Sequence, residues 1–83
     1  PQLKGQDTPE QLLMNDEIVE VIKTAIDKLP EDMRIAIMLR EFEGMSYEEI
    51  AQTMSCPVGT VRSRIFRARE AIDNKLQPLL DKR

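Results

Sequence analysis

The segment from Ser46 to Pro57 constrains the fold more than any other, because it combines a strong helix start with a very short connection. Ser46 and Glu49 have the spacing of a capping box, in which each side chain bonds a free backbone N–H at the start of a helix. This helix should run from Tyr47 to about Met54, and the connection after it is Ser55-Cys56-Pro57. A short capped helix, a tight turn and a longer basic helix together predict a helix-turn-helix.

The helix after Pro57 has a regular apolar repeat, and this repeat fixes which of its faces is buried. The repeating residues are Val58, Val61, Ile65, Ala68 and Ile72. At about 100° per residue, the opposite face carries Gly59, Thr60, Ser63, Phe66, Arg67 and Glu70. Arg62 and Arg69 should flank this open face on one side, and Arg64 on the other. We expect the helix to end near Gln77, because the ring of Pro78 interferes with its continuation.

Two more helices are expected upstream. Thr8 as N-cap, Pro9 at the first helical position and Gln11 at the capping-box position mark the start of the first. It should end before Pro30; the alternative is a break at Asn15-Asp16 that divides it into a short and a longer helix. Its apolar stripe consists of Leu12, Val19, Ile22, Ile26 and Leu29.

The second helix should begin at Pro30, with Glu31 and Asp32 in its first turn, and stop at Gly44. It has too many apolar residues for one core-facing stripe, namely Met33, Ile35, Ala36, Ile37, Met38, Leu39 and Phe42. With no convincing strand, the fold class expected is all-α, a four-helix domain with a C-terminal helix-turn-helix over residues 8–83. Residues 1–7 are polar and resemble the end of an interdomain linker.

The charge is unevenly distributed along the chain. The formal net charge is −3, but residues 1–49 carry a net of −7 and residues 50–83 a net of +4. Arg62, Arg64, Arg67 and Arg69 lie close together in the positive half. Because salt screens exposed charges beyond about 8–10 Å, a local basic patch matters more for binding than the total charge. The pattern therefore permits binding to nucleic acid.

The open face of the last helix has the side chains that a DNA major groove can accept. Gly59, Thr60 and Ser63 are small enough for close approach, and Arg67 can donate two hydrogen bonds to guanine. Phe66 could contact a thymine methyl group, and the flanking arginines suit phosphates. The alternative is that these arginines are only a solvated helix face.

Several other classes of protein are disfavoured by what the chain lacks. There is no His to act as a base or a metal ligand, no glycine-rich phosphate loop, and Cys56 has no second Cys for a disulfide. We therefore expect no catalytic residues, no metal site and no cofactor, and we interpret Cys56 as a small apolar turn residue. No apolar run approaches the roughly 20 residues of a membrane span, and nothing resembles a signal peptide. Because Pro1 is not an initiator Met, we expect a fragment or a processed product.

The stretch LPEDMRIAIMLREFEGMSYEEIAQTMSCPVGTVRSRIFRAREAI, residues 29–72, resembles region 4 of the extracytoplasmic-function sigma factors. The likeness is greatest to the sigma-E group that answers envelope stress. SYEEIA and PVGTVRSRIFRARE carry the resemblance together. One position departs from a wider pattern, since Ser55 stands in the turn where many helix-turn-helix proteins have glycine.

The resemblance implies a cytoplasmic bacterial transcription initiation factor that reads the −35 promoter element, a GGAAC-type sequence in this group. Arg62, Ser63, Phe66 and Arg67 would then face bases of the double-stranded DNA. The residues near the DNA backbone would be Tyr47, Pro57, Gly59, Thr60 and Arg64. It also implies two protein partners, the flap of the RNA polymerase β subunit and a membrane-anchored anti-sigma factor. The apolar excess of the second helix independently suggests a partner surface at Ile35, Met38 and Leu39.

Two alternative functions compete with this interpretation. A LuxR-type response-regulator effector domain also has four helices and a helix-turn-helix, although the arginine cluster and SYEEIA fit it less well. A helical protein-interaction module without DNA binding is compatible with the acidic first half and the Met-rich apolar surfaces.

Overall fold

The computed structural model describes the backbone of residues 9–81 and the side chains of residues 16–81. Within that range the chain forms four helices and no strand, which confirms the predicted all-α class. The helices are α1 (Pro9–Asp27), α2 (Glu31–Glu41), α3 (Tyr47–Met54) and α4 (Val58–Asp81). The expected cap at Thr8 and linker at residues 1–7 lie outside the described residues.

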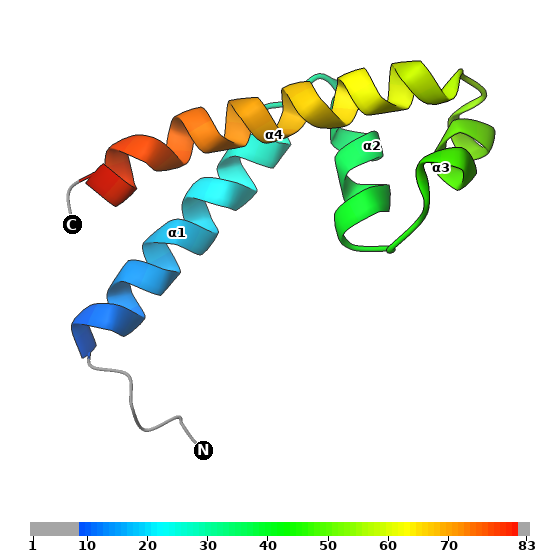
Figure 1. Cartoon of the computed structure of the whole chain (residues 1–83). Coiled ribbons are helices and arrows are strands. Elements are labelled where there is room, and N and C mark those ends of the chain that lie inside the picture. The colour runs from blue at the N-terminus through cyan, green and yellow to red at the C-terminus, as the bar shows by residue number, and fades with distance from the viewer. Residues whose placement is uncertain (1–8, 82–83) are drawn as a thin grey trace.

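The other three helices all pack against α4. In Figure 1 it runs along the top of the molecule, with α3 beneath its N-terminal end, α2 beneath its middle and α1 diverging from its C-terminal half. The core lies where α2, α3 and α4 meet, and its largest fully buried side chains are Ile37, Ile50, Val61 and Ile65. Each of these three helices thus contributes to one small core that holds the start of α4 in place.

Helix α1 differs from expectation in two respects. It is continuous through Asn15-Asp16, so the predicted alternative break does not occur. Val19 was expected in the buried stripe but is 47% exposed, while Ala25 and Leu29 are buried and Ile22 and Ile26 half-buried. The reason is that α1 packs mainly against the single helix α4, and its N-terminal part diverges from that helix (Figure 1). Leu12 lies outside the residues whose side chains are described.

Helix α4 also differs from expectation, because it continues through Pro78 to Asp81. A proline inside a helix removes the hydrogen bond to the carbonyl four residues earlier, here that of Asn74. Asn74 and Pro78 are both exposed, so water can satisfy this carbonyl. The predicted end at Gln77 was therefore wrong by about one turn.

Hydrogen bonds and backbone conformation fix both ends of α3, including the turn that leads into α4. The capping box is present, with Glu49 N–H donating to Ser46 Oγ at 3.1 Å and Ser46 N–H donating to Glu49 Oε1 at 2.8 Å. At the other end Ser55 has φ 55° and ψ 51°, the left-handed conformation, and Cys56 N–H donates to the Ala51 carbonyl at 3.0 Å. This conformation reverses the chain within the short turn and points it into α4.

We predict that Ser55→Gly stabilises the protein, because a Cβ in the left-handed region costs roughly 1–2 kcal/mol that glycine does not incur. Since glycine loses about 0.5–1 kcal/mol more backbone entropy on folding, the net gain should be about 0.5–1 kcal/mol. Denaturant unfolding followed by circular dichroism measures it. The control is Gln52→Gly, at an exposed position inside α3, which should destabilise. Equal destabilisation by both variants would contradict the prediction.

Candidate nucleic-acid interface

The N-terminal half of α4 has one face in the core and the opposite face in solvent. Val61, Ile65 and Ala68 are 0%, 1% and 0% exposed, while Phe66 is 66% exposed. The rotational setting predicted from the apolar repeat is therefore confirmed. The exposed Phe66 ring is therefore available to a partner that approaches this face.

The start of the open face is built from small residues. Gly59 and Ser63 are exposed, Thr60 is half-buried, and Arg67 follows one turn further along. Together with the start of α2 they border a shallow groove of about 470 Å³. Its lining residues are Asp32, Met33, Pro57, Gly59, Thr60, Ser63, Arg64 and Arg67. A Cβ added at Gly59 would meet no other side chain or distant backbone within 4 Å, so packing within the domain does not require glycine here.

The four arginines of the cluster are not equivalent in the folded chain. Arg67 is exposed on the open face and Arg62 is exposed beside it. The guanidinium of Arg62 lies 5.9 Å from the centre of the Tyr47 ring, whose centre is also 4.9 Å from the guanidinium of Arg40. Tyr47 is half-buried against the core, so its ring connects the core to Arg62 beside the open face and to Arg40 of α2.

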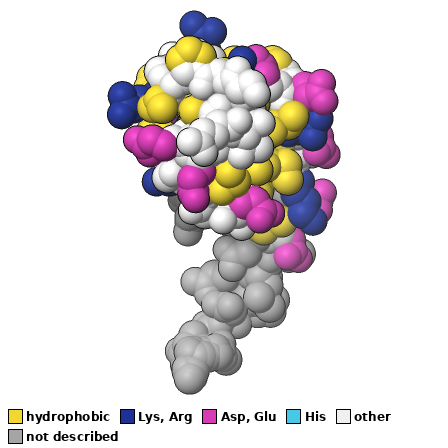
Figure 2. All heavy atoms as spheres, turned by 90° about the vertical axis from the view of Figure 1, so that its right-hand side faces the viewer, with side chains coloured by type: hydrophobic (Ala, Val, Ile, Leu, Met, Phe, Trp, Pro, Cys, Tyr) yellow, Lys and Arg dark blue, Asp and Glu magenta, His cyan; other side chains and the backbone are white. Residues whose placement is uncertain are grey.

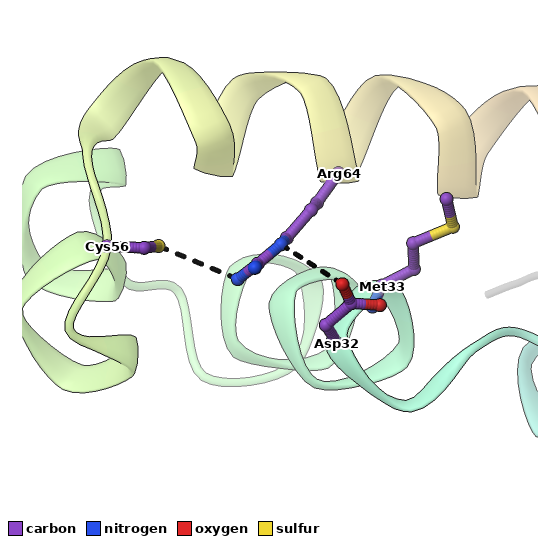
Figure 3. Close-up of polar contacts among 4 residues, drawn as sticks. All are labelled: Asp32, Met33, Cys56 and Arg64. Atoms are coloured by element: carbon purple, nitrogen blue, oxygen red, sulfur yellow. Dashed lines mark hydrogen bonds and ion pairs between the residues drawn. The ribbon is translucent and has the colours of Figure 1, made fainter.

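Arg64 points from α4 toward the start of α2 and the turn (Figure 3). Its Nε lies 3.4 Å from Asp32 Oδ2, and its Nη1 donates to Cys56 Sγ at 3.6 Å. The Arg64 side chain is 24% exposed and that of Asp32 is 52% exposed. Both of its contacts are therefore within the domain, and the predicted contact with a DNA backbone would compete with them.

Arg69 forms an ion pair with Glu41 at the end of α2. This carboxylate accepts a hydrogen bond from the guanidinium and raises the pKa of Arg69 above its ordinary value. Sequence reasoning found neither this pair nor the contacts of Arg40, because the partners come from different helices. Periodicity locates residues on one helix and gives no register between two.

The apolar excess of α2 is divided between the core and the surface. Ala36 and Ile37 are buried, whereas Met38 is 39% exposed and Phe42 65% exposed. Of the three residues predicted to form a partner surface, Ile35 is half-buried, Leu39 is half-buried against the core, and Met38 alone is exposed.

Phe42 also borders a hollow of about 330 Å³ between α1, α2 and α4. Its lining residues are Ile22, Ile26, Ile37, Glu41, Phe42, Arg69, Ile72 and Asp73. The exposed apolar surface of α2 is therefore continuous with an apolar depression, with the Arg69–Glu41 pair among its lining.

Other kinds of site find little support in the described part of the chain. Its His, Cys, Asp and Glu residues form no group of three or more that could hold a metal ion. None of the helices within residues 9–81 is long and apolar enough to cross a membrane.

Comparison with known proteins identifies the domain. Residues 20–72 match the family model described as sigma-70, region 4. The chain belongs to this family. The matched range extends from α1 to the middle of α4 and includes every residue of the predicted DNA interface, from Tyr47 to Arg67. This match favours region 4 over the LuxR-type alternative.

Curated relatives of this region 4 domain are similar over nearly all of it. Over 78 residues, 94% of the chain, it is 62% identical to the ECF RNA polymerase sigma-E factors of Escherichia coli and Salmonella typhimurium. Over the same share it is 63% identical to the RNA polymerase sigma-H factor of Pseudomonas aeruginosa. The chain spans 41% and 40% of the lengths of these two kinds of relative.

We predict that Gly59→Ala leaves the fold intact and stabilises the domain by up to about 1 kcal/mol, because alanine is the better helix former and its Cβ meets no clash. If the open face docks against a duplex, the same methyl group should weaken that binding. Thermal unfolding and a fluorescence anisotropy titration measure the two effects.

The matched control for this prediction is Gly44→Ala. Gly44 has φ 69°, so alanine there is strained and should cost about 1–2 kcal/mol of stability. Gly44 does not line the groove, so the folded fraction should bind duplex as the wild type does. Unchanged binding by Gly59→Ala would show that the duplex does not approach this position closely.

Proposed function

We propose that this domain recognises the −35 promoter element by placing the N-terminal half of α4 in the DNA major groove. The carrying observation is that Phe66 and Arg67 are exposed on the face opposite the buried Val61–Ile65 seam. A major groove about 12 Å wide accepts one helix, and the short capped α3 lies where the bracing helix of the motif crosses the DNA backbone. The match to region 4 and the similarity to sigma factors support the same role.

The roles proposed for individual residues follow the resemblance and the exposure of each side chain. Arg62, Ser63, Phe66 and Arg67 face bases, in a GGAAC-type sequence, and each of them is exposed. A second set lies near the DNA backbone, namely Tyr47, Pro57, Gly59, Thr60 and Arg64. Backbone contacts fix the position of the helix, and base contacts supply the sequence preference.

We further propose that the domain contacts the flap of the RNA polymerase β subunit and so takes part in transcription initiation. The support is the apolar surface of Met38 and Phe42 beside the hollow between α1, α2 and α4. An amphipathic helix can lay its apolar face into a groove of this kind. The surface is separate from the open face of α4, so DNA and polymerase can be bound together.

The remaining proposals depend on the likeness to the sigma-E group. They are that the promoters served belong to envelope-stress genes, that a membrane-anchored anti-sigma factor masks the domain, and that it acts in the bacterial cytoplasm rather than as an enzyme. Identity of 62% to proteins named sigma-E factors supports them. The masking partner would have to cover either the open face of α4 or the apolar surface of α2.

The second candidate function is a protein-interaction module without DNA binding. The exposed Phe42 beside the apolar hollow between α1, α2 and α4 favours it, since a contiguous apolar patch at the surface is typical of a docking site. A titration with duplex DNA over a series of salt concentrations separates the two. Binding through phosphates weakens steeply with salt. The logarithm of the binding constant falls with the logarithm of the salt concentration, with a slope of about 0.9 per phosphate neutralised.

We predict that Arg67→Ala lowers discrimination at one base step, because the lost bidentate contact with guanine contributes roughly 1–3 kcal/mol of preference. Anisotropy titrations against a −35 duplex and its single-base variants measure this effect. The control is Arg69→Ala, which removes the same charge from a guanidinium held by Glu41 and should leave base preference unchanged. An unaltered base profile for Arg67→Ala would disprove its assignment.

A separate prediction tests the polymerase surface. Phe42→Ser should weaken binding to an isolated β-flap fragment severalfold, because the side chain that would insert into the contact is lost. Since Phe42 is 65% exposed, the change should cost little folding stability and leave −35 duplex binding intact. Surface plasmon resonance with the flap immobilised provides the measurement. Undiminished flap binding would place the polymerase contact elsewhere on the domain.

A further inference from the structure

An acidic side chain lies within the surface that should meet DNA. The groove at the start of α4 is lined largely by residues proposed to face the duplex, such as Pro57, Gly59 and Ser63, and Asp32 lines it with them. A carboxylate at this position repels phosphates at close range. A domain built only for tight DNA binding would gain from its absence.

Asp32 is held in the groove by contacts at both carboxylate oxygens. Its Oδ1 accepts the N–H of Met33 at 2.8 Å, and its Oδ2 lies 3.4 Å from Arg64 Nε. It stands in the first turn of α2, where the helix dipole also favours a negative charge. Figure 3 shows Arg64 directed to this carboxylate and to Cys56. Asp32 therefore forms an ion pair with Arg64.

The wider surface at this end of the molecule has a similar balance. In Figure 2, which views the end that carries α3, acidic and basic side chains lie beside one another around the face. The charges on this face do not form a broad basic expanse of the kind that binds any DNA. Affinity for DNA should therefore depend strongly on whether the individual arginines of the groove, Arg64 and Arg67, are available to phosphates.

We propose that Asp32 limits the affinity of this domain for DNA of any sequence, because it pairs with Arg64 and so competes with phosphates for that guanidinium. This inference rests on the proposed function. Every DNA sequence offers the same phosphates, so a free arginine raises affinity for all of them and adds nothing to discrimination. Pairing with Asp32 means that an approaching phosphate must displace a carboxylate, and the base contacts of α4 then decide where binding occurs.

The test compares wild type and Asp32→Asn on a −35 duplex and on a scrambled duplex of the same length, across a series of salt concentrations. Asparagine keeps the shape of the side chain and can still accept the Met33 N–H, so the start of α2 is preserved. We expect affinity for the scrambled duplex to rise about fivefold and the salt slope to steepen by about 1, as for one additional phosphate contact. Affinity for the −35 duplex should rise by the same factor, so the preference for it should not change.

Glu31→Gln is the matched control. Glu31 is also in the first turn of α2 and is exposed, but it does not line the groove. Glu31→Gln removes the same charge from the same helix end but leaves the Asp32–Arg64 pair intact. Its effect on affinity for the scrambled duplex should therefore be much smaller. If both variants raised affinity equally, the effect would be that of net charge alone and the inference would fail.

A double variant examines the pairing itself. In an Arg64→Met background there is no guanidinium to release, so Asp32→Asn should change affinity for the scrambled duplex far less than it does in the wild type. A change of full size in that background would overturn the role of the pair. Unfolding curves for each variant establish that the titrations are made on folded protein.

The same experiment distinguishes failure of this inference from failure of the proposed function. If the wild type showed neither salt-dependent binding nor preference for the −35 duplex, the proposed function itself would be refuted. If the wild type bound and discriminated while Asp32→Asn left affinity for both duplexes unchanged, only the role of Asp32 would be refuted. A loss of affinity in Asp32→Asn would also refute it, because Asp32 would then assist DNA binding.

Discussion

The rotation of α4 about its own axis fixes which of its side chains face the core and which face solvent. Val61, Ile65 and Ala68 are buried against α2 and α3, and this contact fixes every other position of the helix by its angular spacing. Phe66 and Arg67 face outward as a consequence of that seam. A change that loosened the seam would therefore alter the open face without replacing any of its residues. The core of this small domain is thus also the part that aims the interface.

The turn before α4 supplies the second constraint, which is direction. Ser55 adopts a left-handed conformation that costs energy for a residue with a Cβ, and the capping box at Ser46 fixes the other end of α3. Between them the backbone has little freedom, so α3 and α4 hold a defined angle. Rotation is set by packing and direction by the turn, and recognition of a groove by a single helix requires both.

Ion pairs between helices, more than the net charge, determine which basic side chains of this domain are available to a partner. Arg64 is paired with Asp32 and Arg69 with Glu41, in each case with an acidic residue of α2. Arg62 and Arg67 are exposed at the open face, with Arg62 near the Tyr47 ring. Helix α2 therefore does more than support the core, because its acidic residues determine which arginines of α4 are available. Its exposed Met38 and Phe42 give the same helix a further surface, away from the open face of α4.

Local signals in the chain were enough to predict the four helices and the two faces of α4. Capping residues, prolines and apolar spacing act over a few residues, so α3 was predicted from Tyr47 to about Met54, as observed, and Phe66 was correctly expected in solvent. Two predictions were wrong because they depended on the surroundings of a residue and not on its neighbours in sequence: the end of α4 before Pro78 and the burial of Val19. Three features are visible only in the folded chain: the pairing of the arginines, the left-handed conformation of Ser55, and the position of Asp32 in the groove beside Gly59. The physical reason is that these features depend on the register between α2 and α4, and that register is set by core packing between residues far apart in the chain.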